Sequence, residues 1–94
     1  MKNFSLMRII YKAKEKVMLE LYYSDSCPYC KKVINYFKEN DINFEAKNVS
    51  EGKNYDKVIS LGHKSQVPFL IDTDNNKMMY ESDDIINYVK SLTN

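Results

Sequence analysis

The chain has 94 residues, with 14 Lys plus Arg against 13 Asp plus Glu and only two Cys. This length fits one small domain, and the net charge of +1 lacks the basic excess typical of nucleic-acid binding. Hydrophobic residues make up 44% of the chain, which is enough apolar material for a core. Glu20 interrupts the most apolar stretch, residues 17–23, well short of the ~20 apolar residues of a membrane span. We therefore expect a folded, monomeric domain that neither spans a membrane nor binds nucleic acid.

The N-terminal segment is basic and carries a rough helical stripe that includes Leu6, Ile9 and Ala13. The stripe predicts an amphipathic helix, so we divide the chain into a helical extension, 1–16, and a main domain, 17–94. We expect this helix to pack on the sheet edge and the protein to have no membrane partner, with binding to a membrane surface as the less favoured alternative. Basic residues interrupt any signal-peptide core and no small-residue cleavage site follows, so we expect a cytoplasmic protein.

The main domain alternates between strand patterns and helix patterns. Val33, Ile34 and Phe37 recur at helical spacing after Pro28, and Gly62 is expected to end a second helix in a left-handed conformation. The separation of the first two strands favours parallel pairing, whereas the polar turn before the last strand favours an antiparallel hairpin. In chain order, the expected elements are a strand at 17–23, a helix from Pro28 to Asn40–Asp41, a strand at 43–49, a helix at 50–61, strands at 67–71 and 77–80, and a helix at 81–92.

The motif Cys27-Pro28-Tyr29-Cys30 directly follows the first predicted strand. Proline is favoured at the first helical position, so Cys27 stands where the free N–H groups and the dipole of the helix favour a thiolate. Cys30 lies on the same side of the first turn, within reach of a disulfide. The spacing therefore predicts a redox pair in which Cys27 attacks and the more buried Cys30 resolves.

Two structural interpretations of the cysteines compete with this one. A Cys-x-x-Cys pair can be half of a zinc site, but structural zinc needs four ligands and only His63 offers itself as a third. The pair could also be two unreactive core cysteines, which the position of Pro28 at a strand-to-helix junction disfavours. We therefore expect no metal.

The order of elements and the Cys-Pro-Tyr-Cys motif resemble a dithiol glutaredoxin across residues 17–92. Two further stretches, Gln66-Val67-Pro68 and Glu81-Ser82-x-x-Ile85-x-x-Tyr88-Val89, are similar to the glutathione-site motifs of glutathione-transferase N-terminal domains and of the bacterial glutaredoxins built like them. The resemblance implies an α/β thioredoxin fold with a four-stranded mixed sheet flanked by helices, here with an extra N-terminal helix.

The resemblance also implies a glutathione site and a cis Val67–Pro68 bond, where residues alone would favour an ordinary trans proline at a strand start. In that site the Val67 backbone pairs with the cysteinyl part of glutathione, and Ser82 with the helix N-terminus receives the γ-glutamyl carboxylate. An acid receives its amine and Lys64 its glycyl carboxylate, although segment 81–83 could equally be a helix cap. The residues assigned to glutathione are Tyr29, Lys64, Gln66, Val67, Pro68, Glu81, Ser82 and Asp83.

The chain departs from the family pattern at two places. Ser24 stands where many glutaredoxins carry a lysine, and Met79-Tyr80 replaces a Gly-Gly pair. The implied function is that of a thiol–disulfide oxidoreductase in electron transport and cell redox homeostasis. It uses glutathione as reducing co-substrate and acts on disulfide-containing or glutathionylated proteins. The alternatives are a non-catalytic glutathione-binding or redox-sensing module, an iron–sulfur or metal carrier, and an enzyme served by a thioredoxin-type reductase.

Overall fold

The computed structural model describes residues 19–93, so the predicted helix at 1–16 lies outside the described residues. Three helices and four strands follow one another in the order predicted for the main domain. They are β1 (Leu19–Tyr23), α1 (Pro28–Glu39), β2 (Glu45–Asn48), α2 (Asn54–Gly62), β3 (Phe69–Asp72), β4 (Lys77–Met79) and α3 (Ser82–Thr93).

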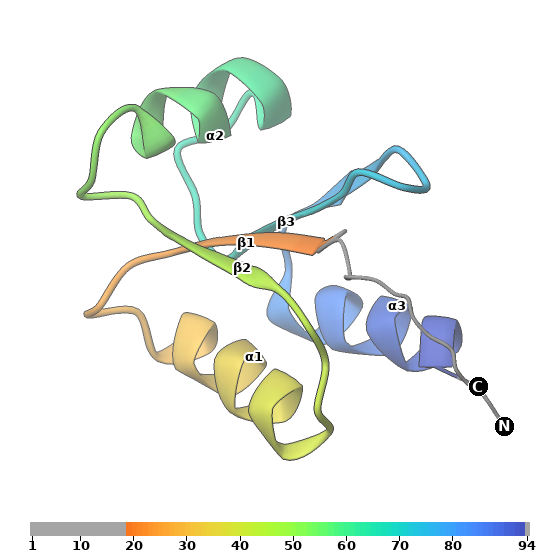
Figure 1. The fold of residues 1–94 in the computed structure, drawn as a ribbon. Helices are drawn as coiled ribbons and strands as arrows, with labels where there is room; N and C mark the ends of the chain where they lie inside the picture. The colour runs from red at the N-terminus through yellow and green to blue at the C-terminus, as the bar shows by residue number, and fades with distance from the viewer. Residues whose placement is uncertain (1–18, 94) are drawn as a thin grey trace, which may run out of the picture.

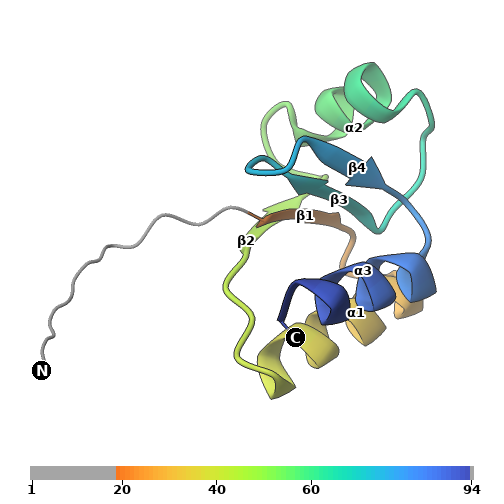
Figure 2. The ribbon, with the colours of Figure 1, turned by 90° about the vertical axis from the view of Figure 1, so that its right-hand side faces the viewer.

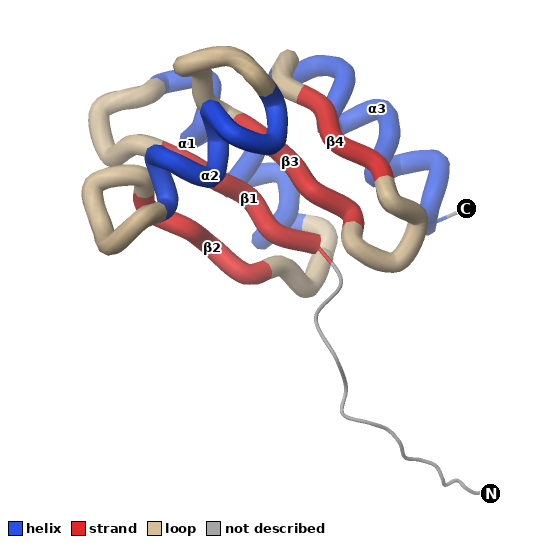
Figure 3. The backbone as a smooth tube through the Cα atoms, turned by 90° about the horizontal axis from the view of Figure 1, so that it is seen from above, coloured by secondary structure: helices blue, strands red, loops and turns tan. Residues whose placement is uncertain are grey.

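The four strands form one mixed sheet in the order β2-β1-β3-β4, which is visible from above in Figure 3. β1 runs parallel to β2 and antiparallel to β3, and β3 pairs with β4 as an antiparallel hairpin. Figures 1 and 2 show α2 on one face of the sheet and α1 with α3 on the other. The predicted four-stranded mixed sheet flanked by helices is therefore confirmed.

Strand alternation gives each face of the sheet its own core. On β1, Leu19 and Leu21 face α1 and α3, whereas Tyr22 faces α2. Each fully buried aliphatic side chain contributes about 1.5–3 kcal/mol. Within residues 19–93, no helix is long and apolar enough to cross a membrane. The larger core holds Leu19, Leu21, Val33, Phe37, Leu70, Ile85 and Val89, and the smaller one Tyr22, Val58 and Phe69.

Helix α2 begins at Asn54, later than the apolar pattern predicted. The Asn48 side chain accepts hydrogen bonds from the backbone N–H of Ser50 at 2.9 Å and from its hydroxyl at 2.8 Å. The Asn54 side chain in turn donates to the Asn48 carbonyl at 2.8 Å. These local bonds satisfy the backbone in a turn, so the helix starts only after them.

The predicted left-handed conformation at Gly62 is wrong. Gly62 is the last helical residue of α2, and His63 adopts the left-handed conformation with φ 69°. A Cβ atom at Gly62 would overlap the Tyr80 hydroxyl and lie 2.8 Å from Cε1 of Phe69. Glycine is therefore required here by the close approach of two aromatic rings. The left-handed residue that ends the helix is His63, one position later than predicted.

Candidate functional site

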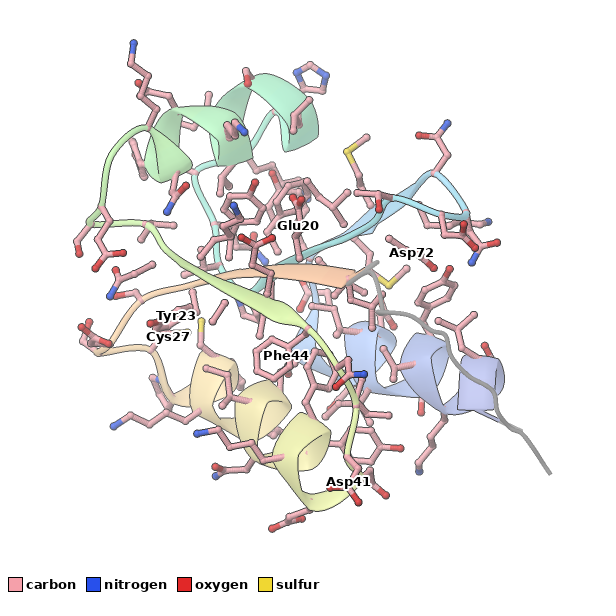
Figure 4. The ribbon with its side chains drawn as sticks, viewed as in Figure 1. Glu20, Tyr23, Cys27, Asp41, Phe44 and Asp72 are labelled. Carbon is pink, nitrogen blue, oxygen red and sulfur yellow. The ribbon has the colours of Figure 1, made fainter. Side chains whose placement is uncertain are left out.

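Cys27 occupies the N-cap of α1, as predicted. The chain leaves β1 at Tyr23 and turns, and the Cys27 N–H donates to the Ser24 carbonyl at 3.2 Å. The Cys27 Sγ accepts the backbone N–H of Cys30 at 3.1 Å, and Pro28 fills the first helical position. Figure 4 places Cys27 just beyond the end of β1 where Tyr23 lies. A sulfur anion at this position therefore receives a hydrogen bond from the free N-terminal turn of the helix.

The two cysteines differ in accessibility, and both are free thiols. Cys27 is partly exposed, whereas Cys30 is 0% exposed. Burial raises the pKa of the Cys30 thiol to about 12. The hydrogen bond with Cys27 and the charge on that sulfur act in the same direction, against a lowering by the backbone of Ser24. Cys27 is thus the sulfur that an incoming disulfide can reach.

The peptide bond between Val67 and Pro68 is cis, as the resemblance implied. The antiparallel register pairs Tyr22 with Phe69, so the residues just before β3 lie beside those just after β1. The Cys27 thiol donates to the Val67 carbonyl at 3.8 Å. The backbone carbonyl of Val67 therefore lies next to the Cys27 sulfur.

A groove of about 630 Å³ lies at this edge of the domain. It runs between the segment before β3 and the first turn of α3, with Tyr29 of α1 at its side. The groove contains every residue that the resemblance assigned to glutathione except Lys64. Its lining residues are Tyr29, Gln66, Val67, Pro68, Glu81, Ser82, Asp83 and Asp84.

The first turn of α3 contributes the largely buried residue Ser82 to the lining of the groove. Ser82 is 8% exposed, and within residues 19–93 no hydrogen bond to its hydroxyl is found. The Ile85 N–H bonds to the Glu81 carbonyl at 2.9 Å, which leaves the earlier N–H groups of the helix unbonded within it. A buried hydroxyl beside such N–H groups forms a ready site for a carboxylate.

Two polar contacts join the walls of the groove to each other and to α1. The Gln66 amide donates to the Glu81 carboxylate at 3.2 Å across the groove. Lys32 on α1 forms a 2.7 Å ion pair with Asp83, although both side chains remain largely exposed. Because both side chains are exposed, this ion pair contributes little to the stability of the fold.

Lys64 and His63 lie outside this groove. The Lys64 ammonium lies 5.4 Å from the centre of the Tyr80 ring, and its role toward the glycyl carboxylate stays a prediction. His63 is an exposed residue at the C-cap of α2. Among residues 19–93 there is no group of three or more His, Cys, Asp or Glu side chains that could hold a metal ion.

Sequence reasoning missed two members of the site. Asp84 lines the groove, and its place in the same helical turn as Ser82 was the available signal. The Lys32–Asp83 pair joins residues far apart in the chain. No local sequence signal could have found that pair.

The fold and the paired cysteines at the start of α1 define a thioredoxin-fold protein with a dithiol site. The chain belongs to the glutathione S-transferase N-terminal domain family, whose sequence profile matches residues 21–94. No match was found among curated proteins.

Solved structures with this fold include glutaredoxins. Glutaredoxin 2 from Salmonella typhimurium, in complex with glutathione, is 27% identical with a TM-score of 0.70 over 83% of this chain and 35% of its own. The chain thus spans about a third of that protein. A glutaredoxin from Archaeoglobus fulgidus is 22% identical with a TM-score of 0.65, over 80% of this chain and 88% of its own. A thioredoxin-like protein is 17% identical with a TM-score of 0.67, over 79% and 97%.

Proposed function

We propose that the protein is a glutathione-dependent thiol–disulfide oxidoreductase of the glutaredoxin type. The observation that carries the proposal is the position of Cys27, a partly exposed sulfur at a helix N-terminus, 3.8 Å from the Val67 carbonyl at the edge of the groove. The family match and the glutathione complex of a 27% identical glutaredoxin support the same ligand. We place the reaction in the cytoplasm, where glutathione keeps thiols reduced.

The first chemical step is an exchange at Cys27. Its thiolate attacks the glutathione sulfur of a mixed disulfide, which forms a Cys27–glutathione disulfide and releases the protein substrate as a thiolate. The thiolate of a second glutathione then attacks the glutathione sulfur, which frees Cys27 and produces glutathione disulfide. The two exchanges balance, because one disulfide and one free glutathione thiolate are consumed while one glutathione disulfide and one protein thiolate are formed, so glutathione is the only reductant required.

Cys30 provides the second route of resolution. Its thiolate would attack the Cys27 sulfur, release glutathione and leave a Cys27–Cys30 disulfide. Burial raises the pKa of the Cys30 thiol and so disfavours the thiolate that this attack requires. We therefore propose that glutathione resolves its own mixed disulfide faster than Cys30 does.

The proposal is tested by reduction of a small glutathione mixed disulfide, coupled to glutathione reductase and NADPH. Cys27→Ser should abolish turnover, whereas the matched variant Cys30→Ser should keep about half of the wild-type rate or more. Turnover by Cys27→Ser would overturn the assignment of the nucleophile. A folded wild-type protein that fails to use glutathione would overturn the proposed reductant.

A further inference from the structure

Tyr80 lies in the short connection between β4 and α3, next to the groove but outside its lining. Its hydroxyl accepts the Lys64 backbone N–H at 3.1 Å. The single hydroxyl proton can go to the Lys64 carbonyl at 3.0 Å or to the Val58 carbonyl at 3.3 Å. One side-chain oxygen therefore bonds to the backbone of α2 and to the loop that follows it.

The ring of Tyr80 is held in place as well. It packs against Phe69 with ring centres 4.6 Å apart, and the Lys64 ammonium lies 5.4 Å from its centre. Gly62 contributes only a hydrogen atom toward the phenol, because a Cβ there would overlap the hydroxyl. The position of the Tyr80 hydroxyl is thus set by its neighbours on several sides.

The groove has two walls, one formed by Gln66 and Val67 and the other by Glu81 and Ser82, and both lie close in sequence to the residues of these contacts. Glu81 and Ser82 follow Tyr80 directly, and Gln66 lies two residues beyond Lys64. The direct contact between the walls joins the Gln66 and Glu81 side chains, which are both candidates for binding glutathione. A ligand can replace that contact, whereas the Tyr80 hydroxyl bonds only to backbone groups of Val58 and Lys64, which lie outside the groove lining.

We propose that Tyr80 is a positioning residue for glutathione. Its hydroxyl fixes the Gln66–Val67 wall relative to the Glu81–Ser82 wall, and so presets the spacing between the groups that hold the two ends of one ligand. This inference rests on the proposed function, since it assigns the preset spacing to glutathione. Tyr80 touches neither the reacting sulfur nor, by this geometry, the ligand.

The test uses Tyr80→Phe, which removes one oxygen and keeps the ring against Phe69. The KM for glutathione should rise about three- to tenfold with kcat unchanged, because bonds that preorganise binding are lost. The rate at which iodoacetamide alkylates Cys27 should not change. Tyr36→Phe on α1 is the matched control, since within residues 19–93 the structure gives the Tyr36 hydroxyl no hydrogen bond.

A second variant, Gly62→Ala, perturbs the Tyr80 hydroxyl without changing Tyr80 itself. Gly62→Ala should displace the phenol and raise the KM as well, and the double variant should show no further increase over Gly62→Ala alone. An unchanged KM in an active, folded Tyr80→Phe protein would overturn the inference, as would fully additive effects in the double variant.

Failure of the proposed function is distinguishable from failure of this inference. If the wild type does not use glutathione, the proposed function fails, and the backbone amide signals of Tyr80→Phe then decide the role of Tyr80. Shifts at both Val67 and Ser82, with faster exchange of the Lys64 amide, would show that Tyr80 sets the spacing of the walls. Shifts confined to one wall, or absent, would overturn the inference in that case too.

Discussion

The Tyr88 hydroxyl on α3 donates a 2.6 Å hydrogen bond to the carboxylate of Asp72 at the end of β3. Asp72 is 1% exposed, and its other bonds come from the turn that follows it. The backbone N–H groups of Asp74 and Asn75 donate at 3.1 and 3.2 Å, and the Asn75 side chain at 2.8 Å. One buried carboxylate therefore closes the β3–β4 hairpin and anchors the last helix to it.

Removal of the Tyr88 hydroxyl should destabilise the protein. Tyr88→Phe deletes one charge-assisted bond to Asp72 and should lower the free energy of unfolding by about 1.5–3 kcal/mol. Urea denaturation followed by circular dichroism measures this change. The control Tyr36→Phe should stay within about 0.5 kcal/mol of the wild type. Equal stability of the two variants would show that the bond to Asp72 contributes nothing.

The same carboxylate should make stability depend on acid pH. Burial opposes the charge of Asp72, but the bonds from the Asn75 side chain, Tyr88 and the backbone outweigh it and lower the pKa from its usual 3.8. The unfolded chain then binds a proton more readily, so Asp72 stabilises the fold at neutral pH and loses this effect as pH falls below about 4. The stability difference between wild type and Asp72→Asn should therefore shrink in acid. A difference that is constant between neutral and acid pH would contradict the assignment.

Alkylation should distinguish the two cysteines. Because Cys30 is buried and its pKa is raised to about 12, iodoacetamide at about pH 8 should modify Cys27 alone in the folded protein. Both sites should react in urea. The two residues share one tryptic peptide, so fragment ions in mass spectrometry must locate the label. Equal labelling of both cysteines in the folded state would contradict the burial of Cys30.

A substitution at Ser82 should distinguish a role in ligand binding from a role in helix capping. If its hydroxyl holds a carboxylate of glutathione, Ser82→Ala should raise the KM for glutathione about tenfold or more with kcat unchanged. Stability should change little, since the described structure gives this hydroxyl no partner in the free protein. A capping role would instead cost about 1 kcal/mol of unfolding free energy and leave the KM unchanged. Steady-state kinetics and thermal denaturation of the wild type and of Ser82→Ala decide between these roles.

The features that were predicted correctly from the residues are those that depend on local sequence patterns. Proline at the first helical position located the start of α1, and with it Cys27 at the N-cap. The polar turn after Asp72 located the β3–β4 hairpin. The cis Val67–Pro68 bond came from family resemblance, because most X-Pro bonds in proteins are trans.

The features that sequence reasoning missed depend on contacts between distant segments. Gly62 was expected to supply a left-handed backbone, whereas it leaves room for the ring of Tyr80, eighteen residues away in the chain. The late start of α2 depends on the side chain of Asn48, which lies in the preceding strand. Local periodicity carries no information about either contact.

The direction of β1 determines which end of the domain tolerates attachment. β1 begins at Leu19, which pairs with Asp72. Both residues lie at the end of the sheet opposite Cys27, as Figure 4 shows for Asp72 and Cys27. The length of the strand separates the two ends of the sheet by about 15 Å. A tag, surface tether or carrier protein joined ahead of Leu19 therefore enters the domain away from the reactive sulfur.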